Sequence, residues 1–291
     1  MILVVGATGL VGGEVCKKLA SRGEKVRALV RTTSSKEKVE ALRSAGVELC
    51  VGDLKDPDSL AAACRSVDAV ISTASSTLSR QAGDSIESVD GVGQMNLVNA
   101  AKAANVGRFL FVSFRRPPGF IFPLGDAKRA VEEAIASMNF TVIQASYFME
   151  VWLGPELGFD YANATARICG PGTSPVSWVS FVDVAEMCAV AIRHPAAERR
   201  TIEFGGPEAI SLMDVVSLFE KFGGKTFKVE HVPEEVLLAQ FEGATDSMQK
   251  TFAALMLGSI RGDAMDMRAV AEEFGIKLAS IDEYAYGVSG A

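Results

Sequence analysis

The sequence predicts an α/β fold in which helices cover both faces of a doubly wound parallel sheet. Two observations carry this prediction. Over residues 1–144, short and continuously apolar segments alternate with longer segments whose apolar residues recur at helical spacing. A turn with three glycines separates the first apolar segment from the first helical one. Strands that are apolar on both faces are typical of a parallel sheet, which binds its ligands beyond the carboxyl ends of the strands.

Six strands can be followed in order along this part of the chain. They are expected at ILVV (2–5), KVRALVR (25–31), VELCVGDL (47–54), DAVIST (68–73), RFLFVSF (108–114) and FTVIQAS (140–146). The helices between them are recognised by their spacing and by their first turns. The first helix carries Val11, Val15 and Leu19 on one face, and the third begins at Pro57, a residue favoured at the first helical position. The last of these helices is expected within residues 122–137.

Composition excludes several classes of protein. The formal net charge of -7 argues against nucleic acid as the main partner, because neutralising phosphates requires a basic surface. Five scattered cysteines without a CxxC pair are typical of a reducing compartment. A strand begins at Ile2, which leaves no room for a secretory signal, and no apolar run reaches about 18 residues. We therefore expect a cytoplasmic protein with no membrane partner and, since His194 and His231 lack a ligand pattern, no metal site.

The glycine turn is the first candidate binding site. Gly6, Gly9 and Gly12 stand between the first strand and the first helix. Glycines there allow a tight turn, a close approach of a pyrophosphate and tight packing of helix on strand, while the helix N-terminus attracts the anion. The alternative interpretation is a strand-to-helix turn that needs small residues for packing alone. Cofactor contacts are expected along the whole turn, at Gly6, Thr8, Gly9, Leu10, Val11 and Gly12.

The end of the second strand selects between the two nicotinamide dinucleotides. An enzyme specific for NAD usually has a carboxylate there, which binds the ribose hydroxyls. This chain has Arg31, whose guanidinium would instead pair with the 2′-phosphate of NADP. Help is expected from the polar residues that follow, Thr32, Ser34 and Lys36. Between residues 17 and 43 there are nine Lys or Arg against three Glu, although Lys17, Lys18 and Lys38 individually are expected to be solvated. The cofactor prediction is NADP(H).

The remaining cofactor contacts are expected at the ends of the other strands. Gly52, Asp53 and Leu54 should lie under the adenine, and Thr73, Ala74 and Ser75 should flank the ribose and pyrophosphate. Ser113, in the fifth strand, is a further candidate cofactor contact. We thus expect a dinucleotide-binding domain at residues 1–149 and a smaller, mostly helical substrate region at residues 150–291, with segments near 178–206 returning to the main sheet.

Several motifs together resemble the NmrA-like, atypical branch of the short-chain dehydrogenases, which is related to the isoflavone-reductase group. They are GATGLVGGEV, VRALVR, GDLKDPDSL, DAVIST, GRFLFVS, FTVIQASYFMEVW and FVDVAE, and they span nearly the whole chain. The resemblance implies a Rossmann domain with a C-terminal substrate region and NADP(H) as cofactor. In those members that are enzymes, it implies reduction of quinones, enones or aryl-ether substrates.

Lys128 is the catalytic candidate, and its support comes from this resemblance. A lysine on the edge of a helix is ordinarily a solvated charge. Most short-chain dehydrogenases carry Tyr-x-x-x-Lys, but here Leu124 stands four residues before Lys128. Isoflavone-reductase-like enzymes keep the lysine without the tyrosine, and the resemblance implies that Lys128 touches the nicotinamide ribose. It also implies that the backbone around Ser146, Tyr147 and Phe148 meets the nicotinamide carboxamide. A missing proton donor favours acceptors such as quinones or conjugated enones, because their reduction leaves a stabilised oxyanion.

Aromatic residues near the strand ends are candidate walls of a substrate pocket. They are Phe114, Phe120, Phe122, Met149, Trp152 and Trp178, and the alternative for each is plain core packing. Arg115 and Arg116, in the same stretch as the first three, are expected to be solvated only.

Three functions are compatible with these residues. The first is an NADPH-dependent oxidoreductase acting on a small apolar, conjugated carbonyl, quinone or related acceptor. The second is a non-catalytic sensor of NADP(H) that regulates a protein partner, which the missing tyrosine would suit. The third, an epimerase or dehydratase of nucleotide sugars, is disfavoured because it needs that tyrosine. A small-molecule substrate, a homodimer and, for a sensor, a protein partner are the expected partners.

Overall fold

The computed structural model describes residues 1–79 and 81–289. Its contacts divide the chain into two compact units. Unit 1 comprises Met1–Phe114, Pro123–Gln144 and Val184–Ile202, and unit 2 comprises Arg115–Phe122, Ala145–Asp183 and Glu203–Ala291. The two units therefore interleave along the sequence, whereas the prediction placed the boundary at residues 149/150 and returned only segments near 178–206 to the main sheet.

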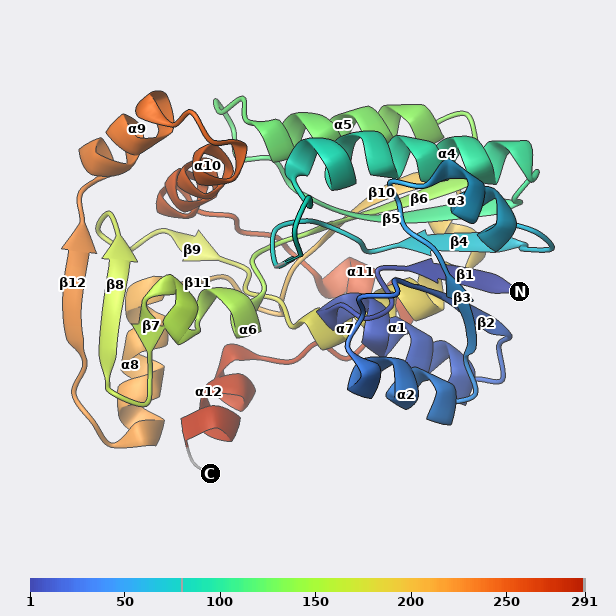
Figure 1. Ribbon diagram of the computed structural model, residues 1–291. Coiled ribbons are helices and arrows are strands. Elements are labelled where there is room, and N and C mark those ends of the chain that lie inside the picture. The colour runs from blue at the N-terminus through green and yellow to red at the C-terminus, as the bar shows by residue number, and fades with distance from the viewer. Residues whose placement is uncertain (80, 290–291) are drawn as a thin grey trace. The chain divides into compact units, whose positions relative to one another are not determined.

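Unit 1 is built on a seven-stranded sheet with the order β10-β6-β5-β4-β1-β2-β3 (Figure 1). The strands are β1 (Ile2–Val5), β2 (Val26–Val30), β3 (Glu48–Val51), β4 (Ala69–Ser72), β5 (Arg108–Phe114), β6 (Phe140–Ala145) and β10 (Arg200–Phe204). The pairs β1–β2, β1–β4, β2–β3 and β4–β5 are parallel, and Ile2 aligns with Val26 on one side and with Ala69 on the other. The order reverses at β1, so the sheet is doubly wound as predicted, and the switch point lies between β1 and β4.

Helices cover both faces of this sheet. Figure 1 shows α3, α4 and α5 on one face and α1, α2 and α7 on the other. The helices are α1 (Leu10–Ser21), α2 (Lys36–Ser44), α3 (Pro57–Ala63), α4 (Gln94–Ala103), α5 (Pro123–Ile135) and α7 (Phe181–Ala191). Pro57 occupies the first turn of α3, as predicted, and the Asp56 carboxylate caps the helix by accepting from the N–H groups of Asp58 and Ser59. The core between the layers includes Leu3, Phe109 and Phe111, none of which is exposed.

A wider helical segment precedes α4 and was not expected from the sequence. It is the π-helical segment η1 (Ile86–Gly93), which runs directly into α4. A reciprocal capping box between Ser85 and Ser88 begins it, and Ile86 and Val89 bury its apolar face. π-helical turns are rare and occur frequently at functional sites. This one places Asp90 in the interior of the unit.

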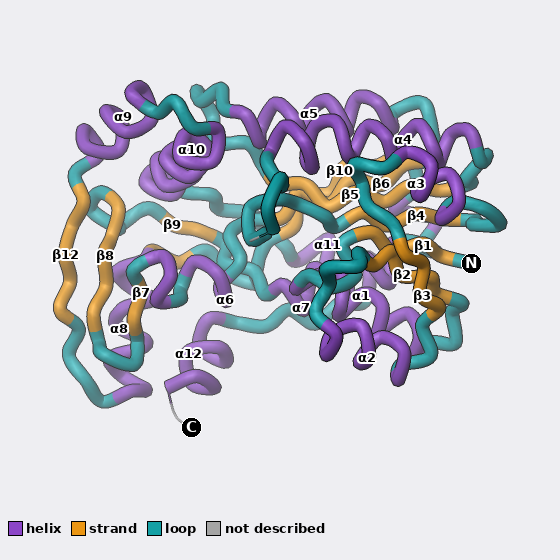
Figure 2. The backbone as a smooth tube through the Cα atoms, viewed as in Figure 1, coloured by secondary structure: helices purple, strands orange, loops and turns teal. Residues whose placement is uncertain are grey.

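Unit 2 combines helices with two small sheets. A three-stranded sheet has the order β12-β8-β7, with β7 (Phe159–Asp160), β8 (Thr165–Cys169) and β12 (Lys228–Val232), and β9 (Pro175–Val176) pairs with β11 (Ile210–Ser211). In Figure 2 the strands β12, β8 and β7 lie side by side. The helical segments are α6 (Met149–Trp152), α8 (Leu212–Gly223), α9 (Glu234–Gly243), α10 (Ser247–Arg261), α11 (Arg268–Phe274) and α12 (Ile281–Ser289), with short 3-10 turns at η2 (Pro155–Leu157) and, in unit 1, η3 (Pro195–Ala197).

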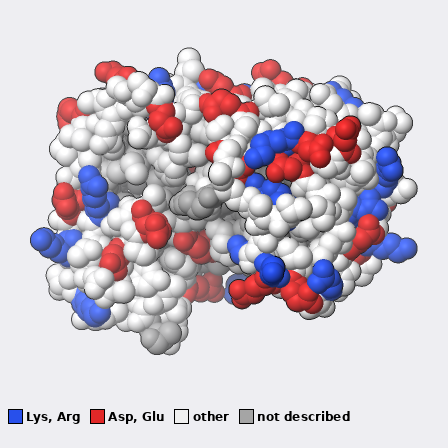
Figure 3. Space-filling view, in the orientation of Figure 1, with Lys and Arg blue, Asp and Glu red and all other residues white. Residues whose placement is uncertain are grey.

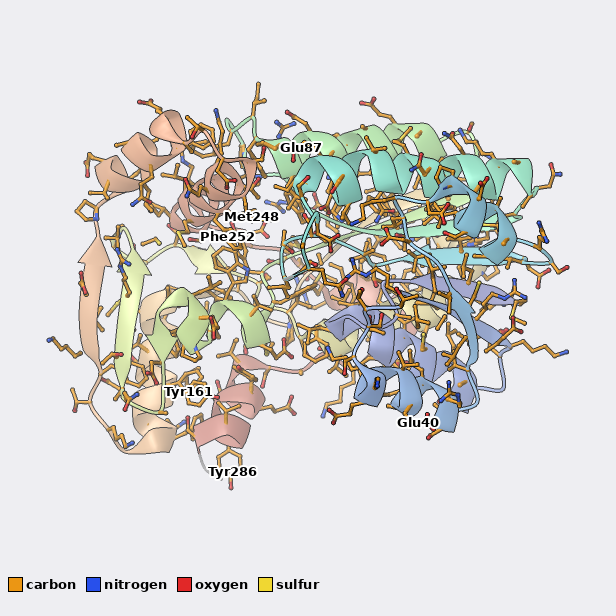
Figure 4. All side chains as sticks on the ribbon, in the orientation of Figure 1. Glu40, Glu87, Tyr161, Met248, Phe252 and Tyr286 are labelled. Atoms are coloured by element: carbon orange, nitrogen blue, oxygen red, sulfur yellow. The ribbon has the colours of Figure 1, made fainter. Side chains whose placement is uncertain are left out.

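The core of unit 2 is a cluster of aromatic side chains. Phe159 and Phe219 meet edge to face with their ring centroids 4.9 Å apart, and Phe227 lies 5.4 Å from Phe159. Tyr161, labelled in Figure 4 beside α8, packs on Phe219 at 5.6 Å. These contacts join the β7–β8 hairpin to α8 and give the unit a hydrophobic core of its own.

No helix in residues 1–79 or 81–289 has both the length and the apolar character needed to cross a bilayer. Over the same residues, His, Cys, Asp and Glu form no group of three or more suited to a metal ion. Acidic and basic side chains are interspersed over the face shown in Figure 3, so that face has no broad basic surface of the kind that nucleic acids bind.

Candidate functional site

The glycine turn at the start of unit 1 leaves no room for side chains. Gly6 has a φ of +87°, and a Cβ there would lie 2.7 Å from the amide nitrogen of Ala74 and from Thr73 Oγ1. A Cβ on Gly12 would lie 2.2 Å from the Gly6 carbonyl oxygen. Gly9 caps α1, and no side chain hydrogen-bonds to the N-terminus of this helix. Packing thus explains two of the glycines, but the open helix N-terminus also fits a pyrophosphate.

The other residues predicted along the turn are placed on α1 and just before it. Leu10 and Val11 begin α1; Val11 is buried, whereas Leu10 is 40% exposed. The carbonyl oxygen of Thr8 accepts a hydrogen bond of 3.0 Å from Lys38 Nζ. Lys38 was expected to be solvated; it is exposed, and its amino group also reaches the glycine turn from α2. The sequence carried no signal for that contact.

Arg31 follows β2 as predicted, and its guanidinium is paired. Its Nη1 donates to Asp84 Oδ2 at 2.6 Å, while Lys55 Nζ lies 2.7 Å from Asp84 Oδ1. Burial would raise the pKa of Asp84, but hydrogen bonds from Lys55, Ser79 and Arg31 outweigh it and hold the pKa at about 2. Sequence reasoning missed Lys55 and Asp84, since neither has a recognisable spacing from Arg31.

The loop after β2 is organised as a turn that leads into α2. The N–H of Arg31 donates to Ser34 Oγ at 2.9 Å, and the N–H of Ser34 returns a bond to the Arg31 carbonyl at 3.0 Å. Thr32 is exposed, and Lys36 is exposed in the first turn of α2. Of the three residues predicted to assist Arg31, Ser34 is hydrogen-bonded to it, and Thr32 and Lys36 are exposed close to it in the chain. Their role toward a 2′-phosphate stays a prediction.

The predicted adenine segment lies immediately after β3. The N–H of Gly52 donates to the Val30 carbonyl at 3.0 Å, which keeps it alongside β2. Asp53 Oδ1 accepts from the N–H of Lys55 at 2.8 Å, and the Asp53 N–H donates to Ser59 Oγ at 3.1 Å. Leu54 belongs to the hydrophobic core. The role of these residues toward adenine stays a prediction.

The residues after β4 face the glycine turn and η1. Thr73 Oγ1 donates to the Val5 carbonyl at 3.2 Å, and the Ala74 carbonyl accepts from Gln94 Nε2 at 2.9 Å. Ser75 is partly buried, and its hydroxyl lies 3.3 Å from that of Thr77. Thr73, Ala74 and Gly6 therefore meet at the switch point of the sheet, where dinucleotides bind in folds of this type.

Lys128, on α5, is a buried residue. It is 5% exposed, and its Nζ donates to the Val112 carbonyl at 3.1 Å and lies 4.6 Å from the centre of the Phe111 ring. Asp90 Oδ1 is 3.9 Å from the same nitrogen. Burial lowers the pKa of Lys128, and the charge of Asp90 opposes that shift. The interpretation of Lys128 as a solvated helix edge is therefore excluded.

Asp90 is the second ionisable group of this buried site. Its Oδ2 accepts from the N–H of Ser76 at 2.9 Å and from the Ser76 hydroxyl at 2.6 Å. Among the described residues its Oδ1 has no hydrogen-bond partner and faces Lys128. Sequence reasoning missed Asp90, because the surrounding residues 86–92 (IESVDGV) mix polar and apolar side chains and carry no clear signal of a buried carboxylate. Ser113, predicted as a cofactor contact, is buried in β5 and accepts from Arg129 Nη2 at 3.1 Å.

Unit 2 contains the remaining residues predicted at the nicotinamide end. The Ser146 hydroxyl donates to Asp263 Oδ2 at 2.7 Å, and the Tyr147 hydroxyl donates to the Leu255 carbonyl at 2.8 Å. Burial raises the pKa of Tyr147. Phe148 precedes α6 and pairs with Val179 in an isolated bridge. Because its hydroxyl is committed to α10 and its pKa is raised, Tyr147 is a poor substitute for the missing proton donor.

The predicted pocket residues occupy different environments. In unit 2, Trp152 and Trp178 flank Tyr147 with centroid distances of 4.8 Å and 6.0 Å. Phe120 meets Phe241 edge to face at 5.4 Å. Four of the six predicted residues are less than a tenth exposed, which core packing explains: Phe120, Phe122, Met149 and Trp178. The other two, Phe114 at the end of β5 and Trp152, are partly exposed. The substrate wall stays a prediction.

The loop that carries Phe120 is bound to α10 within unit 2. Arg115 Nε lies 3.0 Å from Asp263 Oδ1, and Arg261 lies over the Phe120 ring at 5.0 Å. Arg116 Nε donates to the Phe120 carbonyl at 2.9 Å. The expectation that Arg115 and Arg116 are only solvated was wrong, because both hold this loop in place.

A model of the NmrA-like family matches residues 1–285. The chain belongs to the NmrA-like family. Within that family it is 31% identical over 311 residues to the isoflavone reductase homolog IRL of Zea mays, covering 97% of this chain and 96% of the relative. It is 28% identical over 286 residues to the photosystem II assembly factor Ycf39 of Synechocystis sp., covering 94% and 85%.

Solved structures agree with this assignment of fold. The NADPH-dependent quinone oxidoreductase QOR2 of Escherichia coli, complexed with NADPH, matches with a TM-score of 0.80 at 22% identity and covers 99% of each chain. AtPrR2 with NADP+ and (+)pinoresinol matches with a TM-score of 0.78 at 25% identity, covering 98% of this chain and 97% of that chain. The predicted NmrA-like Rossmann fold is thus confirmed, and both neighbours were solved with the cofactor that the sequence predicts.

Proposed function

We propose that this member of the NmrA-like family is an NADPH-dependent oxidoreductase that reduces a small, apolar, conjugated carbonyl, quinone or related acceptor. The observation that carries the proposal is the amino group of Lys128, which is buried near the carboxyl ends of β4 and β5. That edge of a doubly wound sheet is where ligands bind. A buried, partly compensated lysine at such a place is typical of a functional group rather than of packing.

Residues of unit 1 fit the two ends of the cofactor's adenosine half. The open N-terminus of α1 would receive the pyrophosphate, since Gly9 leaves its N–H groups without a side-chain cap. Arg31 and Lys55 supply two positive charges beyond the ends of β2 and β3, where a 2′-phosphate would lie. Both neighbours described above were solved with NADPH or NADP+, which supports the same choice.

Reduction of the acceptor requires a hydride and a proton. The protein's own residues would provide the proton or stabilise the charge that it would neutralise. When bound at this site, NADPH would supply the hydride. Lys128 Nζ, held by the Val112 carbonyl and facing Asp90, would stabilise the oxyanion that develops or donate a proton to it. Burial lowers the pKa of Lys128 and so eases the proton's departure, while Asp90 keeps the amino group charged.

The absence of a tyrosine at position 124 restricts the acceptor. Leu124 is buried at this point of α5 and offers no acid. A simple ketone would leave a strongly basic alkoxide, whereas a quinone or conjugated enone leaves a delocalised oxyanion that one ammonium group can stabilise. The names of the neighbours, a quinone oxidoreductase and a protein bound to pinoresinol, support a conjugated or aromatic substrate.

A steady-state assay tests this function. NADPH oxidation would be followed with a panel of quinones and enones, using wild type, Lys128→Ala and the control Lys102→Ala, an exposed lysine in the last turn of α4. We expect turnover in wild type and control and a loss of about a hundredfold or more in Lys128→Ala. Equal turnover in all three proteins would remove Lys128 from the chemistry, and no turnover with any acceptor would favour the second function.

The second candidate is a non-catalytic NADP(H) sensor that acts on a protein partner. Two observations favour it: the Tyr147 hydroxyl is bound to the Leu255 carbonyl, and the relative from Synechocystis sp. is named an assembly factor. A sensor should bind NADP+ and NADPH and change its capture of a partner between the two, yet show no oxidation that depends on an acceptor. Pull-down with each cofactor, beside the assay above, separates the two functions.

A further inference from the structure

Two basic side chains from different strand ends converge on one carboxylate. Arg31 follows β2 and Lys55 follows β3, yet they bind opposite oxygens of Asp84, at 2.6 Å and 2.7 Å. The Asp84 side chain is 3% exposed, whereas those of Arg31 and Lys55 are 29% and 34% exposed. The cations therefore face solvent on one side and the carboxylate on the other.

Asp84 belongs to the segment of residues 81–88, which contacts the loop after β2 through polar groups. Gln81 Nε2 donates to the Thr33 carbonyl at 3.4 Å, and the side chains of Gln81 and Thr33 are also hydrogen-bonded. The N–H of Asp84 donates to the Gln81 carbonyl at 3.2 Å, and the Ser88 hydroxyl donates to the Gly83 carbonyl at 3.0 Å. Contacts of this kind can be exchanged for other polar partners, including a phosphate.

An arginine and a lysine that share one anion resemble a phosphate site filled by a carboxylate. Arginine and lysine are the side chains that bind phosphate groups, and a carboxylate is a smaller anion of the same chemistry. Asp84 has a pKa of about 2, so it carries its charge throughout the physiological range. A 2′-phosphate that approached Arg31 would meet this fixed negative charge at contact distance, and the two anions would repel each other.

We propose that Asp84 occupies the position of the cofactor's 2′-phosphate and competes with it for Arg31 and Lys55. This inference rests on the proposed function, because it adds Asp84 to the NADPH site in which that function places Arg31 and Lys55. Binding of NADPH then exchanges one anion for another: the phosphate pairs with Arg31 and Lys55, and Asp84 turns away. NADH has no 2′-phosphate and gains nothing from the exchange. Asp84 is thus a specificity-determining residue that weakens the preference for NADPH, and Lys55 is a second phosphate ligand.

Binding measurements on Asp84→Asn test the competition. Asparagine keeps the size of the side chain and removes its charge. We expect NADPH, and the probe 2′,5′-ADP, to bind about tenfold more tightly to Asp84→Asn than to wild type, because one opposing charge is gone, while affinity for NADH changes by less than about twofold. The matched control is Glu40→Gln, which removes an exposed carboxylate paired with Arg43 on α2 (Figure 4) and should change neither affinity. Lys55→Met should weaken NADPH about tenfold and leave NADH unchanged.

Three other outcomes are possible, and each contradicts a different part of the proposal. If NADPH binds wild type but no more tightly to Asp84→Asn, Asp84 holds Arg31 in place rather than competing, and the inference fails while the proposed function stands. If NADH gains as much as NADPH, Asp84 obstructs adenosine in general and not the phosphate. If neither wild type nor variant binds a nicotinamide dinucleotide, the inference and the proposed function fail together.

Discussion

Lys128 Nζ lies 3.9 Å from Asp90 Oδ1, in a site where the aspartate is not exposed at all and the lysine is 5% exposed. The pair joins α5 to the π-helical η1, and the Ser76 hydroxyl and N–H hold the other oxygen of Asp90. Burial of two opposite charges gives a pair whose stability depends on both partners, because either charge left alone would be uncompensated.

Changing Asp90 to Asn should alter the pH dependence of turnover. Burial lowers the pKa of Lys128 and the charge of Asp90 opposes that shift, so removing the charge lowers this pKa further. If protonated Lys128 acts in the reaction, activity falls as pH rises through its pKa. The basic limb of kcat/KM should therefore move to lower pH in Asp90→Asn. A basic limb at the same pH in both proteins would show that Asp90 does not act through Lys128.

Changing Arg31 to Ala should remove most of the discrimination between cofactors. A charge-assisted, two-pronged hydrogen bond contributes roughly 1.5–3 kcal/mol, equivalent to about a tenfold to a hundredfold preference for NADPH. NADH affinity should stay nearly unchanged. Fluorescence titration of both cofactors into wild type and variant measures this effect. Equal affinity of wild type for NADH and NADPH would show that the end of β2 does not select the cofactor.

Gly12→Ala and Gly13→Ala should differ strongly in their effect on stability and cofactor binding. A Cβ on Gly12 would lie 2.2 Å from the Gly6 carbonyl oxygen, whereas one on Gly13 would be 3.5 Å from the Ala7 carbonyl oxygen, an ordinary contact. We expect Gly12→Ala to lose cofactor binding and to cost several kcal/mol of unfolding free energy, on the order of 3. Gly13→Ala should change stability by less than about 0.5 kcal/mol. Thermal unfolding with and without NADPH compares them.

Replacing Arg108 by Met should destabilise unit 1 strongly. Its Nη2 donates to the Thr141 hydroxyl and to the Ala191 carbonyl, both at 2.9 Å, and so ties β5 to β6 and to the end of α7. Methionine leaves these buried oxygens without their donor, which should cost on the order of 3 kcal/mol. The comparison variant is Arg268→Met. The Arg268 side chain is 89% exposed and paired with Asp266, so losing this ion pair should change the free energy of unfolding by a barely measurable amount. Denaturant unfolding of both variants is the measurement; equal midpoints would contradict the assigned role.

The ion pairs of Asp84 with Arg31 and Lys55 should make the free energy of unfolding depend on pH in the acidic range. The pKa of Asp84 is lowered from 3.8 to about 2 in the folded protein. A depressed folded-state pKa stabilises the fold above the unfolded-state value, and this contribution disappears as pH falls through the folded-state value. Wild type should therefore be more stable than Asp84→Asn at pH 7, and the difference should shrink between pH 3.8 and about 2. A difference that stays constant over that interval would contradict the lowered pKa.

The sequence by itself determined the parts of the protein that depend on local pattern. Apolar runs and helical spacing predicted the strands and helices of the sheet in order, because burial on one or both faces imposes a period on neighbouring residues. The glycine turn and the place of Arg31 followed from the same pattern, since a residue that ends a strand in a parallel sheet lies at the ligand edge.

Only the tertiary structure decided which distant side chains share a site. Asp84 lies 53 residues from Arg31 in the chain, and Asp90 lies in a helix type that periodicity does not reveal. The apolar positions that specify η1 and the strands carry no information about which carboxylate will face which cation. That choice is made when the segments between strands fold onto the sheet edge, where burial requires each charge to find a partner.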